Sequence, residues 1–125
     1  MSQLTLTFDG SKVHDFKTFI EEFNRVYSRF EVGWHGNLDA FNDYLAWPDE
    51  KYVLVWKQSE LSRSGLGYGE MAKWLEERLP HCHPVKEPHV RDRVEAAKLG
   101  IGQTMFDLIV EVIGSHGDYV RLRLE

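Results

Sequence analysis

Two aspartates, Asp39 and Asp43, lie four residues apart in the stretch GWHGNLDAFNDYLAW, which runs from residue 33 to residue 47. Four residues make about one helical turn, so both carboxylates would lie on the same face of a helix. Such a pair could serve as a catalytic acid and base, as part of a metal site, or as a docking surface for a positively charged partner. It could also be an ordinary solvated helix face.

The charge of the chain is concentrated around this pair. The 125 residues carry a formal net charge of −5. Between Phe30 and Glu50 there are five acidic residues and no Lys or Arg, so the remainder of the chain is neutral. A local negative field repels nucleic acid and speeds the encounter with a basic partner. We therefore expect no nucleic-acid binding, although acidic stretches are also common in acidic proteins.

The element that must position the two aspartates is a short helix. Asn37 is a favourable N-cap for a helix over about 38–46, and Pro48 would end it. The apolar positions of this helix share one side. The opposite side carries Asp39, Asn42, Asp43 and Ala46.

This outward orientation weakens the catalytic and metal interpretations. A catalytic carboxylic acid usually needs apolar burial, which an outward face does not supply. A magnesium site would need a third nearby acid or a phosphate-binding loop. A solvated face and a docking surface remain open. Trp34, His35 and Trp47 flank the pair, and aromatic residues beside concentrated charge are typical of interfaces.

Other candidate sites are weaker. His81, Cys82 and His83, with His89 nearby, lack the two-plus-two ligand spacing of zinc sites. The glycines of residues 65–69 do not directly follow a strand, as a dinucleotide-binding loop would. No serine or cysteine has a recognisable nucleophile context. We therefore expect no catalytic residue, no metal and no cofactor.

The remaining elements indicate a small α/β domain. Residues 4–8 alternate as a strand, and Ser11 is a plausible N-cap for a helix over about 12–28. Residues 52–56 are almost uniformly apolar, as in a strand covered on both faces. Residues 119–124 alternate as a strand with one wet face. Between these two strands, helical patterns cover about 70–79, 88–99 and 104–113.

The chain is expected to be a single domain over 1–125, located in the cytoplasm. Its length suits one domain. The start of the sequence lacks a signal-peptide pattern, and no apolar run is long enough to cross a membrane. Cys82 is the single cysteine, so the sequence offers no intrachain disulfide.

Two motifs resemble the barstar family of bacterial intracellular ribonuclease inhibitors. Residues 37–45, NLDAFNDYL, resemble the segment that opens the inhibitory helix of that family. Residues 53–58, VLVWKQ, resemble its central strand. Together with the ends of the chain, the resemblance covers roughly residues 3–60 and 103–125. Residues of about 60–102 form a longer stretch that we interpret as a family-variable insertion.

The resemblance implies a three-stranded parallel sheet packed with helices, with a helical insertion between the second and third strands. By position, Asp39 and Asp43 match the aspartates that meet cationic residues of the nuclease, and Asn37 matches the helix cap. Trp34 lies near the family's aromatic contact, and Glu111 lies near its acidic contact in the last helix. In the family, a glycine usually falls two residues before the asparagine, whereas Gly36 is adjacent to it here.

We therefore expect an immunity protein that occludes the basic active site of a cognate ribonuclease toxin in a 1:1 complex and is monomeric when free. An acidic adaptor for another basic protein and a small metal-dependent enzyme are the alternatives. The expected partner-binding residues lie around the short helix and in the last helix: Trp34, His35, Asn37, Asp39, Asn42, Asp43, Trp47 and Glu111.

Overall fold

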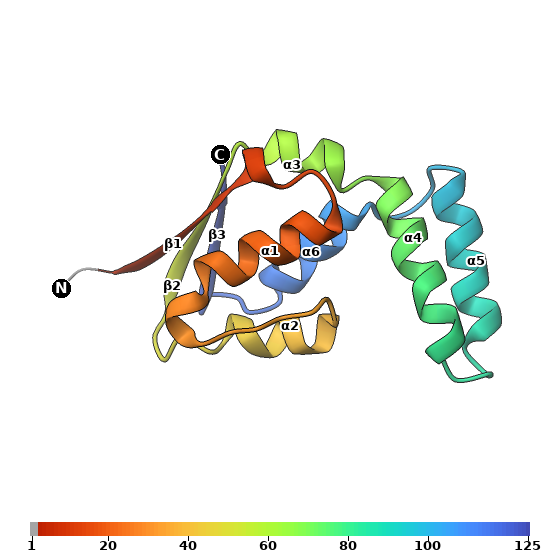
Figure 1. Cartoon of the computed structure of the whole chain (residues 1–125), viewed down its shortest axis with the longest axis horizontal. Coiled ribbons are helices and arrows are strands. Elements are labelled where there is room, and N and C mark those ends of the chain that lie inside the picture. The colour runs from red at the N-terminus through yellow and green to blue at the C-terminus, as the bar shows by residue number, and fades with distance from the viewer. Residues whose placement is uncertain (1–2) are drawn as a thin grey trace.

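A computed structural model describes residues 3–125, and its centre is a sheet of three parallel strands (Figure 1). The strands are β1 (Leu4–Asp9), β2 (Tyr52–Lys57) and β3 (Val120–Leu124), in the order β1-β2-β3. In the register, Leu6 pairs with Leu54, which pairs with Leu122. The predicted three-stranded parallel sheet packed with helices is confirmed.

Helices and 3-10 turns fill the connections. Before β2 these are η1 (Gly10–Lys12), α1 (Phe16–Val26), η2 (Ser28–Phe30) and α2 (Leu38–Leu45). Between β2 and β3 they are α3 (Ser59–Gly65), α4 (Tyr68–Arg78), η3 (Leu79–His81), α5 (Glu87–Lys98) and α6 (Met105–Gly114). The helices predicted between the second and third strands are therefore present. None of the helices within residues 3–125 combines the length and the apolar character needed to cross a bilayer.

The main helices gather on one face of the sheet, where α1, α2 and α6 lie in Figure 1. Phe8 and Trp56 are adjacent on this face and fully buried. On the opposite face the edge strands expose Thr5, Thr7, Arg121 and Arg123. The expectation that β2 is covered by helices on both faces is wrong, because no second helical layer lies on this face in Figure 1, and Val53 and Val55 of β2 lie there between the exposed edge-strand residues.

The start of α1 also differs from the prediction. Ser11 does not cap a helix, because its backbone N–H and its hydroxyl both donate to Asp9 Oδ1. Asp15 is the N-cap instead: its Oδ1 accepts from the backbone N–H of Thr18 at 2.7 Å. The Thr18 side chain in turn accepts from the N–H of Asp15 at 3.0 Å, which completes a capping box.

Aromatic side chains fasten α1 and α2 to each other and to the sheet. The Phe23 ring centroid lies 5.1 Å from that of Phe41 on α2, and Phe19 stacks on Trp56 of β2 at 5.3 Å. Offset and edge-on aromatic contacts of this kind add to the stabilisation from burial. The inner face of α2 is therefore fixed by the core.

Helices α4 and α5 run side by side and project from the rest of the molecule (Figure 1). We call residues 68–98 the α4–α5 arm. Five of its apolar residues are buried and belong to the core cluster of the chain: Met71, Ala72, Leu75, Val94 and Ala97. At its base, Glu70 Oε2 accepts from the backbone N–H of Phe16 at 3.0 Å, and Tyr68 donates to the Gly102 carbonyl.

Candidate functional site

Helix α2 begins where the sequence predicted. Asn37 Oδ1 accepts from the backbone N–H of Ala40 at 3.0 Å, which satisfies one of the free donors of the first turn. Gly36, immediately before the cap, has φ of +110°, a backbone conformation that residues with a side chain rarely adopt. The asparagine cap and the adjacent glycine together set the direction in which α2 leaves the loop.

The two sides of α2 also agree with the helical spacing. Phe41 and Leu45 are fully buried. The side chains on the opposite face are exposed, and they belong to Asp39, Asn42, Asp43 and Ala46. Neither aspartate lies in an apolar pocket, so the burial that a carboxylic acid catalyst requires is missing.

Asp39 and Asp43 also have no basic partner. Neither forms an ion pair with any residue of 3–125, where the six salt bridges join other residues. Asp39 lies in the first turn of α2, where the helix dipole favours a negative charge. Asp43 lies one turn further on, and like charges at this spacing repel each other. The outer face of α2 is therefore an exposed, unneutralised acidic surface.

Buried hydroxyl groups hold the C-terminal end of α2. Tyr52 of β2 donates from its hydroxyl to the carbonyl oxygen of Leu45 at 2.7 Å. The Tyr27 hydroxyl lies 2.6 Å from that of Tyr52. Burial raises the pKa of both tyrosines above the ordinary value, so both hydroxyls keep their protons at neutral pH.

A second anchor lies on the exposed side of α2. His116, in the turn after α6, places its Nε2 2.8 Å from Asn42 Oδ1. Asn42 is thus exposed but already holds one hydrogen bond within the chain. Sequence reasoning did not identify Tyr52 or His116 as supports of this surface, because both reach α2 from distant parts of the chain.

Trp34 requires a correction. Its side chain is only 1% exposed, so it is not a surface anchor for a partner. Its ring lies 4.8 Å from that of Phe41, and its Nε1 donates to the carbonyl of Asn37 at 2.7 Å. Asn24 of α1 bonds both the N–H and the carbonyl of Trp34 at 2.8 Å. Trp34 therefore supports the loop before α2 from inside the core.

The other predicted partner-binding residues are on the surface. Trp47 is 52% exposed just after α2, with its ring 4.9 Å from that of Tyr44. His35 is exposed in the loop before the cap. Glu111 is exposed on α6, which packs against α2, and it accepts a hydrogen bond from the side chain of Gln103.

The structure offers no support for a metal site among the described residues. Within residues 3–125, no three His, Cys, Asp or Glu side chains gather as metal ligands would. In the His81–His83 bend, His83 Nδ1 instead accepts from the backbone N–H of Val85 at 3.1 Å. That bond stabilises the turn between η3 and α5.

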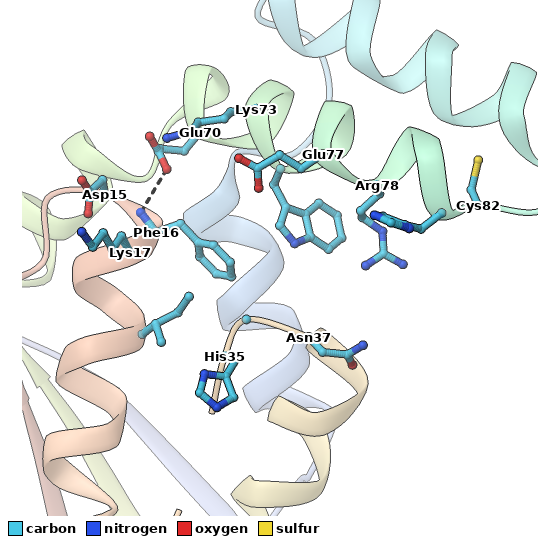
Figure 2. A pocket seen from close by; sticks show the side chains of 14 residues that line it. Asp15, Phe16, Lys17, His35, Asn37, Glu70, Lys73, Glu77, Arg78 and Cys82 are labelled. Atoms are coloured by element: carbon cyan, nitrogen blue, oxygen red, sulfur yellow. Dashed lines mark hydrogen bonds between the residues drawn. The ribbon is translucent and has the colours of Figure 1, made fainter. Parts of the chain in front are cut away.

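A cleft of about 730 Å³ adjoins the start of α2 (Figure 2). One wall consists of the first turns of α1 and residues 35–37, and the other consists of α4 and the following turn as far as Cys82. His35 and Asn37 therefore belong both to the loop that starts α2 and to this cleft.

Comparison with known families agrees with this arrangement. The family model described as Barstar (barnase inhibitor) matches residues 3–82. The match extends beyond residue 60, the expected limit, and includes α3 and α4, whereas residues 103–125 lie outside it. No curated protein and no solved structure matches the chain significantly. Because the matched segment is more than half of the chain and contains β1, α1, α2 and β2, the chain belongs to the barstar family, a family of ribonuclease inhibitors.

Proposed function

We propose that this protein is a cytoplasmic immunity protein that binds the basic active site of a cognate ribonuclease toxin and occludes it in a 1:1 complex. The free protein is monomeric and binds neither nucleic acid nor membrane. Membership of an inhibitor family supports the general activity. The observation that carries the proposal is the exposed pair Asp39 and Asp43, unpaired within residues 3–125 and mounted on a helix fixed by the core.

The physical basis is imitation of the substrate. A ribonuclease holds RNA phosphates with cationic side chains, and two carboxylates on a rigid helix offer the same charges without a cleavable bond. The segment that holds the formal excess of charge surrounds the pair, so it accelerates the encounter with a basic surface. Trp47 provides an exposed aromatic side chain beside the acidic face, as is common at interfaces.

The test measures inhibition of RNA cleavage by two proteins: barnase, and the product of the gene adjacent to that of this protein, which the proposal expects to be a small basic ribonuclease. The wild-type chain should inhibit at least one of them at a 1:1 ratio. Asp39→Ala and Asp43→Ala should each raise the dissociation constant at least tenfold, because each leaves a nuclease cation without its partner. Association should also slow as salt is added.

The matched control is Asp92→Ala, which removes an exposed aspartate of α5 that forms no ion pair within the described residues. It should inhibit like the wild type. If neither nuclease is inhibited, or if all three variants inhibit equally, the proposal is wrong. Tight binding without inhibition would instead favour an acidic adaptor.

A further inference from the structure

The cleft between the α4–α5 arm and the body has an apolar strip along its walls. Phe16 and Ile20 of α1 form one side, Trp74 of α4 forms the other, and all three are partly exposed. The guanidinium carbon of Arg78 lies 4.6 Å from the centre of the Trp74 ring. Trp and Arg are enriched among the residues that dominate binding energy at protein interfaces. Both residues of this stacked pair line the cleft, in which Figure 2 shows Arg78.

The charges of the cleft are divided between its two ends. Asp15, Lys17, Glu70 and Lys73 lie around the first turn of α1 in Figure 2. There Asp15 caps α1 and Glu70 accepts from the N–H of Phe16, so both acids already have partners. This end carries equal numbers of acidic and basic side chains. This end therefore attracts a charged ligand only weakly.

Arg78 lies at the other end, next to the start of α2. It forms no ion pair with any residue between 3 and 125, and Figure 2 shows Asn37 across the cleft from it. Its neighbour Glu77 also lines the cleft. Stacking on Trp74 fixes the guanidinium while leaving its N–H donors free, which is the geometry that binds a carboxylate with two parallel hydrogen bonds.

The cleft reaches the cap at which the acidic helix α2 begins. His35 and Asn37 line the cleft, and Asp39 follows Asn37 by two residues. A nuclease that covers the first turn of α2 therefore borders the cleft, which begins at residues 35–37. At about 730 Å³ the space matches the usual size of a binding pocket, and it is open enough to admit a few residues of extended chain.

We infer that the cleft-lining side of α4 in the α4–α5 arm is a second binding element, and that the cleft receives an extended loop of the nuclease from the border of its active site. The loop places an apolar side chain against Phe16, Ile20 and Trp74 and a carboxylate against Arg78. This inference rests on the proposed inhibition of a ribonuclease. The partner then has a cationic centre for α2 and an acidic loop beside it for the arm, so the arm selects among basic ribonucleases.

A protein segment suits the cleft better than a nucleic acid. Asn37, which lines the cleft, is two residues from the unneutralised Asp39, and the chain as a whole carries −5, so phosphates are repelled on approach. A polypeptide loop can bring one acid to Arg78 and remain otherwise neutral.

The test uses the full-length chain and whichever of the two ribonucleases named above it inhibits more tightly. Arg78→Glu should raise the dissociation constant at least tenfold, because it sets a negative charge against the acidic loop. Trp74→Ala should also weaken binding. The matched control is Lys86→Glu, the same charge reversal at an exposed residue between η3 and α5 that does not line the cleft. It should bind within twofold of the wild type.

A second measurement does not depend on how the variants fold. In the wild-type complex, backbone amide hydrogen exchange in residues 74–82 should slow relative to the free protein, together with that of α2. If α2 is protected and Asp39→Ala weakens binding, but Arg78→Glu binds like Lys86→Glu and residues 74–82 exchange unchanged, the inference about the arm is wrong and the proposed function stands. If Asp39→Ala and Asp43→Ala also bind like the wild type, both are wrong. The inference would also be overturned if the free chain bound a short RNA at least as tightly as it binds the nuclease, and if Arg78→Glu abolished that RNA binding.

Discussion

Replacing Tyr52 with Phe tests how the core holds the acidic helix. The Tyr52 hydroxyl donates to the Leu45 carbonyl at 2.7 Å, so the hydrogen bond with Tyr27 must be donated by Tyr27. Both tyrosines are fully buried. Tyr52→Phe therefore removes one donor and one acceptor at once, and it leaves the carbonyl of Leu45 and the hydroxyl of Tyr27 without this partner inside the protein.

The two possible deletions should differ in cost. A buried polar group left unpaired costs about 1–3 kcal/mol, so two such groups give an expected loss of about 2–6 kcal/mol in the free energy of unfolding for Tyr52→Phe. Tyr27→Phe removes a single hydrogen bond, while the Tyr52 hydroxyl keeps its bond to Leu45. Its expected cost is about 1 kcal/mol.

Urea unfolding followed by far-ultraviolet circular dichroism measures both values. Tyr44→Phe is the matched control, because Tyr44 is only partly buried and its hydroxyl makes no hydrogen bond within residues 3–125. It should change stability by less than about 0.5 kcal/mol. The reasoning is refuted if Tyr27→Phe costs as much as Tyr52→Phe, since the direction of the two hydrogen bonds would then be wrong.

Two further predictions concern stability. Asn37→Ala should lower the free energy of unfolding by about 1 kcal/mol through loss of the cap on Ala40, while Asn37→Asp should retain most of it; thermal melts of the two variants decide this. Because burial raises the folded-state pKa of Tyr27 and Tyr52, their contribution is complete below about pH 10 and is lost as pH rises above it. The urea concentration at the midpoint of unfolding should therefore fall as pH rises from 9 to 11.5. It should fall less in the double variant with Tyr27→Phe and Tyr52→Phe.

Local sequence patterns predict the acidic helix correctly, but they predict its surroundings poorly. The boundaries of α2 and the outward direction of Asp39 and Asp43 follow from a cap and a helical period, both of which act within a few residues. The start of α1 was missed because two capping signals compete there, and the reciprocal hydrogen bonds of Asp15 and Thr18 prevail over Ser11. The capping box, and not the first capping residue in the sequence, therefore determines where α1 begins.

Burial of a loop residue depends on partners that the sequence does not reveal. Trp34 stands among exposed residues, so its type suggested an interface anchor. Asn24, ten residues earlier on α1, binds both backbone groups of Trp34 and turns the indole inward onto Phe41. The sequence alone therefore does not distinguish a tryptophan that contacts a partner from one that supports the charged surface from inside the core.

The cleft was beyond prediction for a related reason. Each of its walls is a recognisable helix, but the position of the α4–α5 arm depends on contacts between distant residues. Glu70 bonds the first turn of α1, and the backbone carbonyl of Leu66 accepts from the N–H of Phe106 at 2.8 Å. Neither contact leaves a periodic signal.

The supports of α2 explain why an unneutralised acidic face can persist. Core aromatics hold its inner side, Tyr52 holds its last turn, and His116 holds Asn42 on the outer side. The repulsion between Asp39 and Asp43 amounts to a few tenths of a kcal/mol, well below the stabilisation that these buried contacts provide. A fixed helix loses little conformational entropy on binding, so the attraction to a cationic site is retained as affinity. The fold thus tolerates a small local strain at the surface where another protein is proposed to supply the opposite charge.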